Sequence, residues 1–448
     1  MSTLTAATLP EPPLVDLPLR QVLHHVRHYH TGLEVFRDQF GPVSRIRIAP
    51  RVLPPFAFVT SPQGMHDVLT ASGEDVDKKT VFHKQTWLWG WNVFNMVHED
   101  WVPRRRILQP VFTKKHVESF TGHMAKSADE VAAEWADAGR ISLNSATRSL
   151  TLRVLGRSLF GLELQHDAPV LEQAVEDQLF YITKRGTAPV RAPVWLPTPQ
   201  RARFRRNVAV VKEIAERGLR VAEAGGDAEL VQKLRDARDP ETGAQLSRQA
   251  IIDELNVFLL AGHDTTATTL AYTLWQLGRH HELQDQVAAE VADLDLSAVT
   301  DAVMKTLPTT MKVLHESLRL CPPAAAIGRS ATRDIEVDGF RLAAGTQIFL
   351  GLYALHRDPA IWGADAAEFR PDRFDEPEGG HKNRWAFLPF GGGHRSCIGD
   401  HFAMIEAVIA LAALVQRLRF TSVEEEFPLA LPFTMTAGGP IPAHVERR

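Results

Sequence analysis

Much of the chain repeats apolar residues at the three-to-four-residue spacing of an amphipathic helix. The clearest repeats cover residues 117–135, 150–162, 169–184, 201–223 and 400–418. The longest covers residues 248–278, and Ser247 stands where a helix cap is expected. Short alternating or apolar runs at residues 43–48, 56–59, 335–342 and 346–350 favour strands. The pattern therefore predicts a mostly α fold with small β-sheets.

Prolines and glycines gather between these segments. Residues 186–199 contain four prolines and predict a loop, and residues 357–396 predict a long irregular stretch before the last helix. Nothing in the composition suggests a linker, so we expect one domain over residues 1–448. Residues 1–20 are rich in proline and lack a long apolar run, which indicates neither a signal peptide nor a transmembrane helix. We expect a cytoplasmic protein.

Composition adds three constraints. Hydrophobic residues make up 44% of the chain, which is enough for a large core, and the net charge of −4 gives no indication of nucleic-acid binding. There are two cysteines, too few for a disulfide framework, so each is judged by its neighbours. Cys321 precedes two prolines and has no glycine or cation directed at it, which predicts a buried core thiol.

The surroundings of Cys397 are different. Residues 390–399 read Phe-Gly-Gly-Gly-His-Arg-Ser-Cys-Ile-Gly and lead directly into an apolar helix. The N-terminus of a helix favours a thiolate over a thiol, and glycines let the backbone pass close to a flat cofactor. Arg395, two residues earlier, could pair with a cofactor carboxylate. The alternative is a glycine turn that holds an inert thiol.

This segment resembles a known family. Phe390, Gly393, Arg395, Cys397 and Gly399 match the Phe-x-x-Gly-x-Arg-x-Cys-x-Gly haem signature of the cytochrome P-450 family. The resemblance covers about residues 101–399 without a departure at any motif position. It implies the family's triangular helical prism, with haem b bound by Cys397 as the iron ligand. It also implies that Phe390, Gly391, Arg395 and Gly399 lie against the cofactor.

A second motif interrupts the longest helix. Residues 261–266 read Ala-Gly-His-Asp-Thr-Thr within an otherwise apolar segment, and such local departures tend to mark functional sites. The segment is similar to the family's Ala-Gly-x-Asp-Thr pattern. The resemblance implies that Thr265 hydrogen-bonds reduced dioxygen and that Asp264 relays protons. Ala261 and Gly262 would leave room for oxygen and substrate. The alternative is a bent helix that admits water.

Further positions match the family's scaffold and cofactor contacts. Glu316 and Arg319 share a helix face and, with Arg373, would stabilise the irregular stretch that presents Cys397. The resemblance also implies that Trp101, Arg105 and Arg329 join Arg395 in binding the haem propionates. The alternatives are core packing for Trp101 and a solvated surface position for Arg105.

These motifs together predict a monooxygenase that inserts one atom of O2 into a hydrophobic small molecule. The chain lacks a nucleotide-binding signature, so we expect electrons from a separate ferredoxin or flavodoxin with its reductase. Fatty acid, terpenoid, steroid and polyketide substrates stay open, with fatty acid slightly preferred. Two other classes stay open as well. One is a haem-thiolate isomerase or dehydratase, against which Asp264 and Thr265 argue, and the other is a non-catalytic haem sensor or carrier.

Two surface features complete the interpretation. Residues 80–96 contain Trp87, Trp89, Trp91 and Phe94 and are expected to cover the substrate cavity, unless these rings pack into the core. A basic cluster, Arg104, Arg106, Lys114 and Lys115, is expected to attract an acidic ferredoxin, unless it is a plain solvated surface.

Overall fold

The computed structural model describes residues 8–47, 54–79, 89–187, 193 and 195–448. Helices account for 57% of the structure and the sheets are small, which confirms the expected fold class. The chain divides into two compact units. The first unit comprises residues 1–87, 95–100 and 318–397, and the second comprises residues 88–94, 101–317 and 398–448. The expectation of a single domain stays a prediction.

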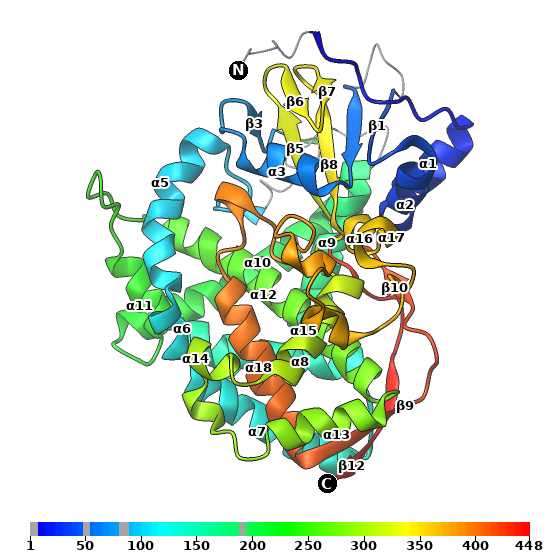
Figure 1. Cartoon of the computed structure of the whole chain (residues 1–448). Helices are drawn as coiled ribbons and strands as arrows, with labels where there is room; N and C mark the ends of the chain where they lie inside the picture. The colour runs from blue at the N-terminus through cyan, green and yellow to red at the C-terminus, as the bar shows by residue number, and fades with distance from the viewer. Residues whose placement is uncertain (1–7, 48–53, 80–88, 188–192, 194) are drawn as a thin grey trace. The chain divides into compact units, whose positions relative to one another are not determined.

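The first unit is built on a five-stranded sheet with the order β1-β2-β8-β5-β3 (Figure 1). The strands are β1 (Val43–Ile46), β2 (Phe56–Val59), β8 (Gln347–Gly351), β5 (Ala326–Ala331) and β3 (Val76–Asp77). Strands β2 and β8 pair in parallel, and the other pairs are antiparallel. Apolar residues of this sheet pack against helix α3 (Pro62–Thr70), and a second cluster packs against α2 (Tyr29–Phe40).

Several predicted elements have different bounds in the structure, and two of them are informative. The strand expected over residues 335–342 is a hairpin of β6 (Ile335–Val337) and β7 (Phe340–Leu342). Asp338 and Gly339 both have positive φ angles, 51° and 78°, as a tight Asp-Gly hairpin turn requires. The helix expected over residues 150–162 is α8 (Leu143–Leu155), which continues as one π-helical turn, Gly156–Phe160.

The second unit is mostly helical, and its longest helix is α12 (Arg248–Leu277). The Ser247 hydroxyl accepts a hydrogen bond from the backbone N–H of Ala250 at 3.2 Å, which confirms the expected cap. Helix α12 packs against α8, α10 (Pro199–Glu223) and α18 (Asp400–Arg417). Helices α7 (Thr121–Ala138), α9 (Ala168–Thr187), α11 (Glu229–Asp236) and α13 (His281–Glu290) also belong to this unit.

Strands in this unit are short. One sheet has the order β4-β12-β9, formed by Arg140–Ser142, Pro442–Arg447 and Leu418–Ser422. A separate hairpin pairs β10 (Leu429–Ala430) with β11 (Thr436–Ala437). Helices α5 (His98–Leu108) and α15 (Pro308–Leu320) each contain a boundary between the two units. Among the described residues, no helix combines the length and the apolarity needed to cross a membrane.

Candidate functional site

The loop before Cys397 folds back on itself in the first unit. The backbone N–H of Cys397 donates to the carbonyl of Phe390 at 2.9 Å, and that of Gly391 donates to Leu388 at 3.0 Å. Cys397 is exposed, whereas Cys321 is fully buried. Burial raises the pKa of the Cys321 thiol to about 12, so this thiol stays protonated and inert, as its neighbours predicted. Helix α18 begins at Asp400, three residues after Cys397 in the chain.

The glycines of this loop have a more specific purpose than the sequence indicated. Gly391 and Gly393 have positive φ angles of 69° and 67°, which other residues rarely adopt. A Cβ atom at Gly393 would collide with the backbone carbonyl of Leu69 at the end of α3. Gly393 therefore makes room for α3, and the expectation that the loop's glycines admit a flat cofactor stays a prediction. By contrast, a Cβ atom at Gly399 would meet open space.

A group of cations lies in the first unit near the same loop. Arg395 donates to the carbonyl of Met96 at 2.9 Å and pairs with Asp77 at 3.3 Å. Arg329 on β5 is the second cation of this group. Strand β3 pairs with β5 so that Asp77 lies opposite Ser330, the residue that follows Arg329. Lys78 follows Asp77 in the chain, which brings a third cation to this group.

The electrostatics of this cation group favour an anionic ligand. Burial, with a contribution from Arg395, lowers the pKa of Arg329 to about 10, and burial lowers the pKa of Arg395 to about 10. Burial and both arginines hold the pKa of Lys78 well below its usual value. An anionic group would relieve the mutual repulsion of these cations. Carboxylates such as haem propionates fit this donor set, and Lys78 is a member that the motifs had not identified.

Trp101 and Arg105 lie on α5 in the second unit. Trp101 is buried, and the Nε atom of Arg105 donates to the side-chain carbonyl of Gln109 at 3.4 Å. Their expected contact with propionates stays a prediction, as do the alternatives of core packing and solvation.

In the second unit, the carboxylate of Asp264 is held by two neighbours. The side chain of Asp264 is 4% exposed, and its Oδ1 accepts hydrogen bonds from Nε and Nη2 of Arg148 at 3.2 and 3.0 Å. Its Oδ2 accepts a hydrogen bond from the Thr434 hydroxyl. Neither partner was found by sequence reasoning, because each lies more than a hundred residues away and belongs to no motif.

The threonine beside Asp264 bonds within the helix. The Thr265 hydroxyl donates to the carbonyl of Ala261 at 2.7 Å, which is the back-bonding that loosens a helix at threonine. Ala261 is exposed, whereas a Cβ atom at Gly262 would approach the Leu155 side chain of α8 to 3.1 Å. Gly262 therefore allows close packing of α12 on α8, and its expected role in making room for oxygen stays a prediction. Burial lowers the pKa of the neighbouring His263 to about 4, so this imidazole is neutral.

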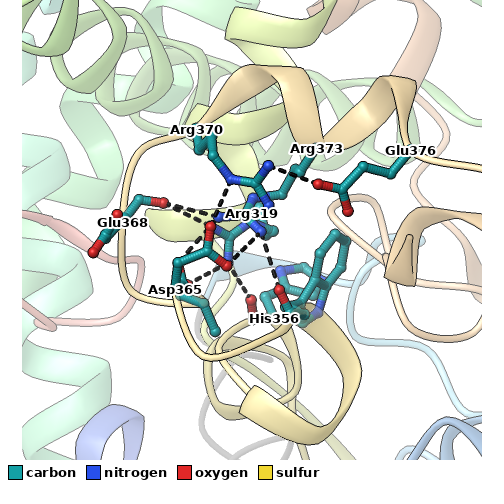
Figure 2. Close-up of polar contacts among 9 residues, drawn as sticks. Arg319, His356, Asp365, Glu368, Arg370, Arg373 and Glu376 are labelled. Carbon is teal, nitrogen blue, oxygen red and sulfur yellow. Dashed lines mark hydrogen bonds and ion pairs between the residues drawn. The ribbon is translucent and has the colours of Figure 1, made fainter. Parts of the chain in front are cut away.

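Arg319 and Arg373 stabilise the irregular stretch before the cysteine loop (Figure 2). Arg319 is fully buried and donates to the carbonyls of His356 and Ala366 at 2.7 and 2.6 Å. Arg373 is also buried and donates to the carbonyl of Asp365 at 3.0 Å. Both arginines also reach the carbonyl of Glu368, at 3.1 and 3.3 Å. This part of the expected scaffold is present, and it includes hydrogen bonds to main-chain carbonyls that the sequence could not reveal.

The tryptophan segment contains both buried and exposed rings. Trp87 lies outside the described residues. Trp89 is 2% exposed, whereas Trp91 is 41% and Phe94 is 36% exposed. The core alternative therefore holds for Trp89, and Trp91 and Phe94 present apolar surface. Two adjacent carboxylates of α12 hold this segment through its backbone, because Trp91 N–H donates to Asp253 at 3.1 Å and Val93 N–H to Glu254 at 3.0 Å.

Three residues of the expected basic cluster form ion pairs with acids of the same chain. Arg104 pairs with the buried Glu254 at 2.7 Å, and Arg106 pairs with Asp239 at 2.8 Å and Glu241 at 2.6 Å. Lys114 pairs with Asp301 at 2.9 Å. These cations are neutralised by acids distant in sequence, so three of the four expected charges already have anionic partners within the chain.

Comparison with known proteins identifies the class of protein. The cytochrome P450 family model matches residues 10–442, so the chain belongs to the cytochrome P450 family. Cyclooctat-9-en-7-ol 5-monooxygenase of Streptomyces melanosporofaciens is 31% identical, over 83% of this chain and 82% of that protein. Cyclooctatin synthase of the same organism is 31% identical over 73% of each chain. Cytochrome P450 734A5 of Oryza sativa subsp. japonica is 30% identical, over 93% of this chain and 80% of that protein.

Membership of this family has chemical consequences. It implies a haem iron cofactor, O2 as a reactant, a redox partner and a hydrophobic substrate. The residues described above suit such a cofactor, because an exposed thiol and buried cations lie in the same unit.

Proposed function

We propose that this protein is a haem-dependent monooxygenase that inserts one atom of O2 into a hydrophobic small molecule. The observation that carries the proposal is the exposed Cys397, two residues after Arg395, whose guanidinium belongs to a buried cation group. Haem b would bind with Cys397 as the iron ligand and with Arg329, Arg395 and Lys78 on its propionates. A thiolate ligand increases electron density at iron and favours cleavage of the O–O bond.

The residues of α12 would control protons and dioxygen. Asp264 would deliver protons as a general acid, and the Thr265 hydroxyl would exchange its bond to Ala261 for one to the reacting oxygen. Phe390, Gly391 and Gly399 would lie against the cofactor, and Ala261 would leave space for O2. Trp101 and Arg105 would add to the propionate contacts. A separate ferredoxin or flavodoxin, with its reductase, would supply two electrons.

The names of the similar proteins suggest which substrates to test first. Two proteins at 31% identity carry names built on cyclooctat-9-en-7-ol and cyclooctatin, so cyclooctat-9-en-7-ol is the first compound to test. Fatty acids, steroids and polyketides complete the panel. A substrate that displaces solvent from the iron changes the haem spectrum from low spin to high spin. Screening the panel for this change identifies the compounds to use in turnover.

The iron ligand is tested by spectroscopy. Cys397→Ser and Cys397→His should abolish the red-shifted Soret band of the ferrous carbonyl complex. Cys321→Ala is the matched control and should leave the band intact. The opposite pattern would overturn the assignment of Cys397.

Turnover separates the proposed function from its alternatives. With a surrogate ferredoxin and reductase, a monooxygenase consumes reduced nicotinamide and O2 as it forms a hydroxylated product. An isomerase or dehydratase converts its substrate without that consumption, and a haem sensor or carrier forms no product. Product formation that does not depend on O2 would contradict the proposal.

A further inference from the structure

The carboxylate of Asp264 accepts hydrogen bonds on both of its oxygens. Arg148 on α8 supplies two hydrogen bonds to Oδ1, and the Thr434 hydroxyl supplies one to Oδ2. Arg148 also donates to the Thr436 hydroxyl at 3.1 Å, so the same guanidinium contacts both the acid and strand β11. These three hydrogen bonds stabilise the charged carboxylate, and the bond from Thr434 competes with water for Oδ2, the oxygen that Arg148 does not contact.

Thr434 is the partner best placed to move. It lies in residues 431–435, the connection between the two-residue strands β10 and β11. It is half-buried, whereas Arg148 comes from the middle of α8, a helix packed against α12. A short connection between two-residue strands shifts more easily than a side chain on a packed helix.

The residue before Thr434 contacts an aromatic cluster. The Phe433 ring lies 5.5 Å from the Trp89 ring, in an edge-on arrangement, and 6.2 Å from the Phe94 ring. The backbone of this cluster is held on α12, because the side-chain amide of Asn256 donates to the Trp89 carbonyl at 2.9 Å. Asn256 precedes Asp264 by eight residues, about 12 Å along a helix. Phe433 and Thr434 thus connect an aromatic surface, with Phe94 partly exposed, to the acid.

We propose that Thr434 is a positioning residue for Asp264, and that apolar contacts on the Trp89–Phe94–Phe433 cluster control whether Asp264 is free to relay protons. The proposal rests on the proposed function. With the cluster unoccupied, Thr434 keeps Oδ2 engaged and proton delivery is slow. A hydrophobic molecule that packs against Phe94 and Phe433 shifts the connection, and Oδ2 becomes available to water.

The test removes only the hydroxyl. Thr434→Val keeps the shape of the side chain without the donor, Thr434→Ser keeps the donor, and Thr421→Val is an exposed control in the same unit. The first measurement is reduced-nicotinamide consumption and peroxide release with a surrogate ferredoxin and reductase, in the absence of any ligand. Thr434→Val should raise both several-fold, whereas Thr434→Ser and Thr421→Val should match the wild type. Equal rates for Thr434→Val and the wild type, or equal rates for Thr434→Ser and Thr434→Val, would overturn the proposal.

A second measurement does not depend on activity. Urea unfolding of Thr434→Val, Asp264→Ala and the double variant should give a smaller midpoint shift for the double variant than the sum of the single shifts. Additive shifts would show that the hydroxyl does not act through Asp264.

A wild-type protein that lacks the red-shifted ferrous carbonyl band would instead contradict the proposed function. With cyclooctat-9-en-7-ol as the probe, stimulation of consumption should be lost in Thr434→Val, and retained stimulation would contradict control by the cluster.

Discussion

The backbone N–H of Leu388 donates a 2.9 Å hydrogen bond to Nε2 of the buried His356. An imidazole nitrogen accepts a hydrogen bond only when it carries no proton, so His356 is neutral in the folded protein. Its own carbonyl accepts from Arg319. Because Leu388 lies two residues before Phe390, this contact holds the start of the cysteine loop. Burial, together with nearby Arg319, lowers the pKa of His356 to about 3.

His356 should make the protein less stable in acid. Its pKa is about 3 when folded and about 6.5 when unfolded, so the unfolded chain binds the proton first as the pH falls. Between pH 6.5 and 5, this difference removes about 2 kcal/mol of the free energy of unfolding. His356→Gln keeps an acceptor for Leu388 but does not titrate, so its stability should fall less over this range.

Urea unfolding at pH 5 and pH 7 measures the difference. His444→Gln, at an exposed position, is the control and should keep the wild-type pH dependence. His263, whose pKa burial lowers to about 4, should add a loss of the same sign that remains in both variants. An unchanged pH dependence in His356→Gln would show that this imidazole is not held neutral.

The pair of Arg104 and Glu254 should matter for stability rather than for electron transfer. Burial raises the pKa of Glu254 to about 7, against the opposing effect of Arg104. Arg104→Leu would leave the buried carboxyl without its cation, at a cost of about 3–5 kcal/mol. Without Arg104, the pKa of Glu254 in the folded protein should rise further. The loss of stability should therefore be larger at pH 8, where the unfolded chain gives up this proton more readily than the folded protein, than at pH 5.

The double variant Arg104→Leu, Glu254→Gln should recover most of this loss, and Lys115→Leu, at an exposed position, is the control for loss of a charge. Unfolding curves at both pH values provide the measurement. A double variant no more stable than Arg104→Leu would show that the pair is not the cause.

Glu406 on α18 should destabilise the protein at neutral pH. Burial raises the pKa of this carboxyl to about 8, whereas an unfolded glutamate titrates near 4.5. Stability should therefore fall as the pH rises from about 4.5 to 8, and Glu406→Gln should raise the free energy of unfolding by about 3 kcal/mol at pH 7. Thermal unfolding should show that Glu406→Gln gains more stability over the wild type at pH 8 than at pH 5. Glu446→Gln, at an exposed position, is the control and should show no gain. A gain independent of pH would contradict the shifted pKa.

The elements that the sequence predicted best are those marked by a specific local motif, such as a helix cap. Helix α12 begins after the expected Ser247 cap, and α18 follows the cysteine loop at the expected position. The hairpin at residues 335–342 was missed because the alternation of apolar and polar residues does not by itself distinguish one strand from two. Asp338-Gly339 was the signal that could have separated them.

At the candidate site, local sequence predicted the motifs but not their partners. The inert nature of Cys321 followed from its neighbours, and burial confirms it. Arg148, Thr434 and Lys78 were missed because their importance comes from tertiary contacts with groups elsewhere in the chain. The same limitation applies to the basic cluster, whose role in attracting a ferredoxin stays a prediction. Arg104 and Arg106 are adjacent to other cations in sequence, but their charges are directed at Glu254 and Asp239.

Thr265 and Asp264 should separate oxygen consumption from product formation. Thr265→Ala keeps the helix but removes the hydroxyl that would hold the reacting oxygen, so cofactor consumption should continue while much of the flux is lost as hydrogen peroxide. Asp264→Asn keeps hydrogen-bonding capacity but cannot cycle a proton, and turnover should slow by about a hundredfold to ten-thousandfold. Thr273→Ala, two turns along α12, is the matched control because its hydroxyl also bonds back within the helix.

The measurements are reduced-nicotinamide consumption, peroxide and product for each variant under identical conditions. Added peroxide should restore part of the product yield in both Thr265→Ala and Asp264→Asn, because it bypasses the reduction of O2. Thr273→Ala should match the wild type in every measurement, since its hydroxyl has no assigned role in the reaction. If Thr265→Ala and Asp264→Asn also formed as much product per cofactor consumed as the wild type, at the same rate, neither side chain would take part in proton delivery. The polar residues of α12 would then serve only the structure of the helix.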